Sequence, residues 1–301
     1  GETTKEYTFE SCGEKLDMAE LQEIWESKLE PVYPYRKAGP TVEKINGSLT
    51  APAAPKIGVA KPKVIIPVFP GTNCEYDTAK AFARAGADPE ILVIRNLTPA
   101  DVTASCEALV KAIGESQIVM LPGGFSGGDE PDGSAKFIAS FFRSPAVTEA
   151  VRDLLQHRDG LMLGICNGFQ ALIKLGLVPY GDIRPITAYD PTLTFNTIGR
   201  HQSMLVRTRI ASTGSPWLSK CEVGEQFTVA ISHGEGRFVA PQEVLDTLMK
   251  NGQIATQYVD IEGDPTMDQS YNPNGSVLAI EGITSPDGRV FGKMGHSERS
   301  G

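Results

Sequence analysis

The sequence predicts an α/β fold: a flavodoxin-like parallel sheet flanked by helices and continued by a β-rich antiparallel extension. Short apolar runs alternate with helical patterns between residues 63 and 175, as in βαβ units joined by right-handed crossovers. One apolar run turns sharply through glycines into a helix at residues 161–170. Beyond residue 185 the helical period gives way to short β-rich segments, which favours an antiparallel extension.

The alternating elements can be placed along the chain by their periodicity. Apolar runs typical of buried parallel strands cover residues 64–69, 91–94, 118–121 and 161–163. Helical spacing predicts helices over 77–87, 99–113, 134–143, 145–157 and near 241–250. The β-rich segments are 204–210, 227–231, 254–259, 277–281 and 289–294. Because active sites of parallel sheets lie beyond the carboxyl ends of the strands, the loops at 70–75 and 122–129 should meet the turn at residue 166.

Two parts are expected in the chain. Residues 1–61 read as an N-terminal helix and linker, with an amphipathic stripe over 16–30 and an aperiodic Pro/Gly/Ala stretch at 38–62. This helix is expected to pack on the main domain or on another body, because it has little partner surface of its own. Residues 62–301 form the main domain.

Composition and charge restrict the expected cellular location and binding partners of the protein. The 301 residues carry a net charge of −9 without a Lys/Arg block, so a nucleic-acid partner is not expected. No apolar run is long enough to span a bilayer and no signal peptide begins the chain, so no membrane association is expected. The five scattered cysteines show no metal-binding spacing, which indicates a reducing, cytoplasmic protein without a metal.

The strand-to-helix turn carries the candidate nucleophile, Cys166. Glycines two residues before and two after it, Gly164 and Gly168, let the backbone double back as in a nucleophile elbow. A helix N-terminus favours thiolate, and the N–H of Asn167 is placed to help stabilise an oxyanion. Cys74 is the competing nucleophile, because it also follows a strand but lacks the glycine frame.

Other residues could complete a thiol-based site. Gly124 lies in a Pro-Gly-Gly loop after a strand, where N–H groups can turn inward as a second oxyanion donor. His296 is followed two residues later by Glu298, so the carboxylate could orient the imidazole as a base. His233 and Glu235 have the same spacing in a glycine-containing stretch, which suggests a mobile loop and a competing base.

These motifs together resemble the class I (triad) glutamine amidotransferases. The resemblance rests on Pro-Gly-Gly at 122–124, Gly-x-Cys-x-Gly-x-Gln at 164–170 and the C-terminal His-x-Glu. Within that family, the stretches at 70–74, 233–236 and 272–276 are similar to the glutaminase domain of phosphoribosylformylglycinamidine synthases, in the form where it is the C-terminal part of one large chain. This resemblance implies that residues 1–61 are the tail of the preceding region. The usual Pro-His-Pro-Glu-Arg is Gly-His-Ser-Glu-Arg here, at residues 295–299.

The resemblance implies roles for individual residues. Cys166 would be the nucleophile, His296 its base and Glu298 the group that orients the base, while Gly124 and Asn167 would supply the oxyanion N–H groups. Residues implied to hold L-glutamine are Gln170, Asn196, Arg200 and His201. His233 and Glu235 would face the synthase domain and the ammonia path.

The implied reaction is the hydrolysis of L-glutamine to glutamate and ammonia. The ammonia would pass to an ATP-dependent synthase domain that converts formylglycinamide ribonucleotide to formylglycinamidine ribonucleotide in de novo purine biosynthesis. No Walker-type phosphate loop occurs in the sequence, so no cofactor is expected in this chain, and ATP and Mg²⁺ would bind the synthase portion. The alternatives are a cysteine hydrolase or peptidase with the same elbow, and a non-catalytic regulatory module of a synthase.

Overall fold

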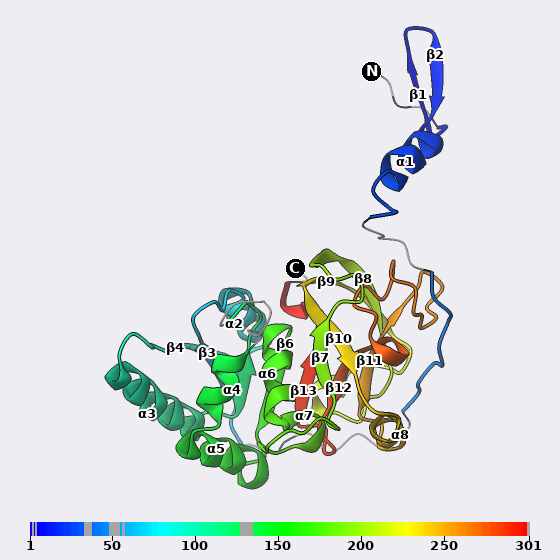
Figure 1. Ribbon diagram of the computed structural model, residues 1–301. Coiled ribbons are helices and arrows are strands. Elements are labelled where there is room, and N and C mark those ends of the chain that lie inside the picture. Colours follow the sequence, from blue (N-terminus) through cyan, green and yellow to red (C-terminus); the bar gives the residue numbers. More distant parts are fainter. Residues whose placement is uncertain are drawn as a thin grey trace.

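A nine-stranded sheet forms the centre of the molecule in the computed structural model, which describes residues 1, 3, 5–32, 38–47, 55, 58–126 and 135–299 (Figure 1). The strand order is β4-β3-β5-β6-β13-β12-β11-β8-β9. The strands are β3 (Lys63–Val68), β4 (Asp88–Val93), β5 (Ile118–Leu121), β6 (Leu161–Ile165), β8 (Gln202–Ile210), β9 (Gln226–His233), β11 (Ile254–Val259), β12 (Ile280–Thr284) and β13 (Val290–Lys293).

The first half of the sheet is parallel, as predicted. Strands β4, β3, β5, β6 and β13 run in one direction. The side chains of Val64, Ile65 and Ile66 in β3 are fully buried, because helices cover both faces of a parallel sheet. The helices are α2 (Glu75–Arg84), α3 (Pro99–Glu115), α4 (Lys136–Phe142), α5 (Pro145–Arg152) with the π-helical turn η1 (Asp153–His157), α6 (Asn167–Leu175), α7 (Leu177–Tyr180) and α8 (Gln242–Lys250). None of the described helices is long and apolar enough to cross a membrane.

The second half of the sheet is the antiparallel extension. Strands β12, β11, β8 and β9 pair antiparallel, which confirms the predicted class. The strand expected at 277–281 lies instead at Ile280–Thr284, because Leu278 and Ala279 have φ of +52° and +56° and form a turn. A separate two-stranded sheet, β7 (Thr192–Phe195) with β10 (Glu235–Val239), was not expected.

The N-terminal residues form a small unit of their own. A hairpin of β1 (Thr8–Ser11) and β2 (Glu14–Asp17) precedes α1 (Met18–Ser27), and Figure 1 shows this unit apart from the sheet. The helix begins at Met18 rather than at residue 16 because the Asp17 carboxylate caps it, accepting from the N–H groups of Ala19 and Glu20. No residue of α1 is buried, and Trp25 is 78% exposed, so this helix does not pack on the main domain.

The stretch expected as a linker holds a segment bound to the sheet. Residues 38–47, here called the strap, lie along the antiparallel half, whereas residues 48–54, 56 and 57 of that stretch lie outside the described residues. The buried Arg209 donates 2.6 Å hydrogen bonds to the Ile45 carbonyl and to Asn46 Oδ1. Gln257 accepts from the Ile45 N–H at 3.0 Å and donates to the Glu43 carbonyl. The strap is therefore part of the folded body.

Arg209→Met is expected to release the strap. Hydrogen bonds to a charged group contribute about 1.5–3 kcal/mol each, and methionine keeps the volume of the stem without the donors. In this variant, amide hydrogen exchange should become faster over residues 42–47 and stay unchanged in the parallel strands. Unchanged exchange at Ile45 would show that the strap is held by other contacts.

Candidate active site

The turn after β6 has the geometry of a nucleophile elbow. Cys166 has φ of +52° and ψ of −107° and sits at the N-cap of α6, a backbone conformation that costs a non-glycine residue about 1–3 kcal/mol. The glycines on either side allow close packing rather than positive φ. A Cβ at Gly164 would lie 2.6 Å from the Gly168 carbonyl oxygen, and one at Gly168 would lie 1.9 Å from that of Leu121. The strain is thus concentrated on the cysteine.

Two loops at the same sheet edge are joined beside Cys166. The N–H of Phe125 donates to the Gly71 carbonyl at 2.8 Å, and Thr72 and Gly124 form an antiparallel bridge. Gly124 has φ of +147° and approaches so closely that a Cβ would lie 2.6 Å from the Gly71 oxygen. Ser126 donates through Oγ to Asn167 Oδ1 at 2.6 Å, which fixes the glycine loop against the first turn of α6.

The last strand brings His296 to the same edge. β13 runs parallel to β6, and the Cys166 N–H donates to the Lys293 carbonyl at 2.9 Å. His296 lies three residues further on, and its backbone N–H donates to the Ala230 carbonyl at 2.9 Å. Its Nδ1 lies 2.6 Å from Glu298 Oε1, with both side chains at least 95% buried. The predicted His–Glu pair therefore forms.

These groups line one pocket of about 70 Å³. Its lining residues are Asn73, Cys74, Gly124, Phe125, Cys166, Ser232, His296 and Arg299. The pocket brings together the predicted nucleophile, the predicted base and one predicted oxyanion residue, with Glu298 behind the base. Asn73, Phe125, Ser232 and Arg299 line the pocket but were not predicted as site residues. Asn73 and Arg299 lie within sequence motifs, next to Cys74 and Glu298.

The competing nucleophile lies in the same pocket. Cys74 Sγ is 4.0 Å from His296 Nδ1 and accepts from Arg299 Nη2 at 3.3 Å. Burial, only partly offset by the Arg299 charge, raises the pKa of the Cys74 thiol to about 11. Donor atoms of Cys74, His296 and Glu298 lie within 4.8 Å of one another, a spacing that a metal ion could use, but the guanidinium on the sulfur opposes a cation there.

The comparisons with known proteins agree with this geometry. A family model described as the CobB/CobQ-like glutamine amidotransferase domain matches residues 61–301. The chain belongs to this family. It is a glutamine amidotransferase, an enzyme with glutaminase activity, so the non-catalytic alternative and the peptidase alternative lose their support.

Individual relatives narrow the comparison. The chain is 35% identical over 240 residues to the phosphoribosylformylglycinamidine synthase subunit PurQ of Aquifex aeolicus, covering 79% of this chain and 91% of that protein. Identity to the PurQ of Symbiobacterium thermophilum is 36% over 236 residues, with 77% and 86% covered. Among solved structures, PurLQS from Thermotoga maritima matches with a TM-score of 0.57 and 26% identity, covering 80% of this chain and 89% of that one.

The residues expected to hold glutamine lie around the amidotransferase pocket rather than in its lining. Gln170 is buried, and its amide is held at both ends, accepting from Asn167 Nδ2 and donating to the Glu235 carbonyl at 2.6 Å. Asn196 donates to the carbonyls of Arg200 and His233. His201 is exposed, and its Nε2 lies 3.0 Å from Oγ of Ser232, a lining residue.

His233 is not on a mobile loop, contrary to the expectation. It is the last residue of β9, is 1% exposed, and precedes β10, whose first residue Glu235 is 6% exposed. Gly236 is required beside it, since a Cβ there would lie 2.5 Å from the imidazole ring. Burial, reinforced by His296 and His201, lowers the pKa of His233 to about 3, so the ring is neutral at physiological pH.

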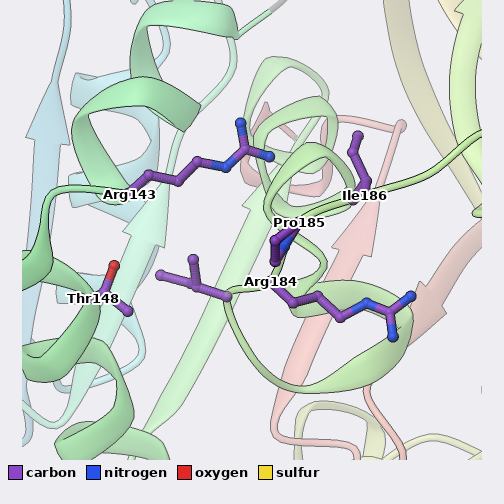
Figure 2. A pocket seen from close by; sticks show the side chains of 6 residues that line it. Arg143, Thr148, Arg184, Pro185 and Ile186 are labelled. Atoms are coloured by element: carbon purple, nitrogen blue, oxygen red, sulfur yellow. The ribbon is translucent and has the colours of Figure 1, made fainter.

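A larger cavity lies elsewhere in the molecule. It has a volume of about 530 Å³ and is lined by Arg143, Thr148, Ile183, Arg184, Pro185 and Ile186 (Figure 2). These lining residues offer no thiol, imidazole or carboxylate, and Arg184 is engaged by Asp190 and by the Tyr180 ring. Thiol chemistry therefore belongs to the smaller pocket at Cys166.

Proposed function

We propose that this chain is the glutaminase part of a phosphoribosylformylglycinamidine synthase, acting through a γ-glutamyl thioester on Cys166. The observation that carries the proposal is the pocket that joins an elbow cysteine to a buried His–Glu pair, in a chain 35% identical to PurQ across 91% of that subunit. Ammonia released here would serve an ATP- and Mg²⁺-dependent synthase portion that converts formylglycinamide ribonucleotide to formylglycinamidine ribonucleotide.

The proposed roles follow from the positions of the atoms. The Cys166 thiolate attacks the side-chain amide carbon of L-glutamine, and the N–H groups of Gly124 and Asn167 stabilise the oxyanion. His296 protonates the departing ammonia and then deprotonates the water that hydrolyses the thioester. Glu298 holds Nδ1 of His296, which leaves Nε2 for this proton transfer.

Cys166 is preferred to Cys74 as the nucleophile on three grounds. Cys74 faces Nδ1 of His296, the nitrogen already bound to Glu298. Burial keeps Cys74 protonated, with its pKa at about 11. Cys166 occupies the strained elbow position at the N-terminus of α6, where partial positive charge favours a thiolate.

Glutamine recognition and ammonia transfer are assigned to the neighbouring strands. Gln170, Asn196, Arg200 and His201 are proposed to shape the glutamine side of the pocket, because Gln170 and Asn196 fix the β9–β10 turn and His201 contacts Ser232. His233 and Glu235 are proposed to line the ammonia path, since the ring nitrogens of His233 and Glu235 Oε2 are buried without a hydrogen-bond partner among the described residues. A neutral imidazole would not trap ammonia as ammonium.

The synthase partner is proposed to belong to the same polypeptide, with residues 1–61 as the tail of the preceding region. The named relatives are separate subunits, so this point departs from them. Support comes from the exposed apolar side chains of α1, Ile24 and Trp25, which need another body to cover them.

The five cysteines are free thiols, in keeping with the proposed cytoplasmic location.

Residues 1–301 alone are expected to release glutamate weakly, and the synthase portion is expected to raise kcat, because docking completes such sites. The measurement is glutamate release with and without that portion, accompanied by calorimetry with ATP. Tight ATP binding by residues 1–301 alone would contradict the proposed division of labour. Hydrolysis of peptides or esters in preference to glutamine would contradict the assigned reaction.

A further inference from the structure

A buried ion pair lies directly beneath the turn that carries His296. Glu281 in β12 has a fully buried side chain and Lys293 in β13 is 8% exposed, with Nζ 3.7 Å from Oε1. The antiparallel register that sets Lys293 opposite Gly282 brings the two residues together. Burying two charges costs several kcal/mol each before their attraction is counted, so the pair calls for a role beyond stability.

The contacts of the pair go to the two residues that flank His296. Oε1 of Glu281 accepts the backbone N–H of Gly295 at 2.6 Å. Nζ of Lys293 donates to Oγ of Ser297 at 2.7 Å. The other carboxylate oxygen of Glu281 is held by the Thr256 hydroxyl. Each end of the His296 turn is thus tied to one member of the pair.

The glycine at position 295 allows the turn to approach the Glu281 carboxylate closely. A Cβ at Gly295 would lie 2.5 Å from Cγ2 of Val229 and 3.0 Å from Glu281 Oε1. Glycine therefore allows the chain to approach the carboxylate. A glycine and a serine give the turn little rigidity of their own, so its position depends on external contacts.

We infer that Glu281 and Lys293 are positioning residues that hold His296 at the distance from Cys166 that proton transfer requires. The inference rests on the proposed role of His296 as the base. Neither side chain is assigned a contact with substrate; both act through the backbone N–H of Gly295 and the hydroxyl of Ser297. Misplacement of a catalytic group by about 1 Å can lower a rate roughly 100-fold.

The test uses Glu281→Leu/Lys293→Met, which replaces the pair by apolar groups of similar length, assayed with the synthase portion present. Expected results are a kcat for glutamine hydrolysis lowered about 10- to 100-fold, with KM within about twofold, because the glutamine contacts are untouched. Glu281→Gln/Lys293→Met keeps an acceptor for the Gly295 N–H and should lie between this variant and the unmodified enzyme. The NMR signal of the His296 Nδ1 proton should broaden or shift in the same order, which a purely structural role would not produce.

Two further variants keep the test decisive. Ser297→Ala removes one contact without stranding a charge, and it should lower kcat by about threefold or more even if the double variants fold poorly. Lys63→Met/Glu90→Gln removes a 2.6 Å pair between β3 and β4 and should leave kcat unchanged. An unchanged kcat in Ser297→Ala, or in either double variant that folds, would overturn the inference. An undiminished kcat in His296→Ala would instead overturn the proposed function.

Discussion

Cys166→Ala is expected to abolish glutamine hydrolysis, with a loss on the order of 10⁴-fold or more, because no thioester can form. Cys74→Ala is the matched control from the same pocket and should keep most of the activity. The contrast follows from the positions of the two sulfurs. Cys166 sits at the strained elbow, whereas Cys74 faces the imidazole nitrogen that Glu298 already holds. Glutamate release by the two variants, at matched protein concentration, is the measurement.

Covalent labelling distinguishes the two thiols directly. A glutamine-like electrophile should modify Cys166 at neutral pH, since the buried Cys74 thiol, with a pKa of about 11, is protonated there. As the pH approaches that value, Cys74 should begin to react, because the thiolate is the reactive form. Peptide mass spectrometry that found the neutral-pH label on Cys74 would reverse the assignment of the nucleophile.

His296→Ala is expected to remove thioester formation, with a rate loss of roughly 10²–10⁴-fold for the lost acid–base group. His233→Ala should spare the reactivity of Cys166 and weaken only the coupling between glutaminase and synthase. The two histidines differ in their partners: His296 is bound to Glu298 in the pocket lining, whereas His233 is buried and neutral.

Single-turnover labelling of Cys166 and ammonia-dependent synthesis should be followed in both histidine variants. If His296→Ala and His233→Ala lost labelling equally, the assignment of His296 as the base and of His233 to the ammonia path would be contradicted. Thermal unfolding is the folding control, since replacing a buried imidazole by alanine leaves a cavity.

Much of the site could be predicted because its chemistry is encoded locally. The glycines at 164 and 168 mark the elbow within five residues, and the His-x-Glu spacing at 296–298 places both partners on one turn. Parallel strands carry such turns to a common edge, and the short apolar runs of the first half predict those strands. The sequence did not predict that the positive φ would fall on Cys166 while the two glycines serve close packing.

Features that depend on distant contacts could not be predicted. The first paired residues of β7 and β10, Phe195 and Glu235, lie 40 residues apart in the sequence. The amide of Asn196 helps to hold this pairing by donating to the His233 carbonyl. Cys74 ranked below Cys166 as the candidate nucleophile because it lacks the flanking glycines. The sequence did not predict that both cysteines would line one pocket. The aperiodic stretch before the main domain gave no sign that Arg209 and Gln257 would bind it.

The strap has a consequence for where this protein can be trimmed. The family match begins at residue 61, and a recombinant domain cut there would retain the whole thiol pocket. It would also lose the Ile45 carbonyl and the Asn46 side-chain oxygen, which accept hydrogen bonds from the Arg209 guanidinium. A permanently charged group in the body of the domain would then have to find solvent or new acceptors. A shortened protein should therefore begin before Thr41, whose bridge to Thr266 is the first strand-like contact of the strap with the sheet domain in the described structure.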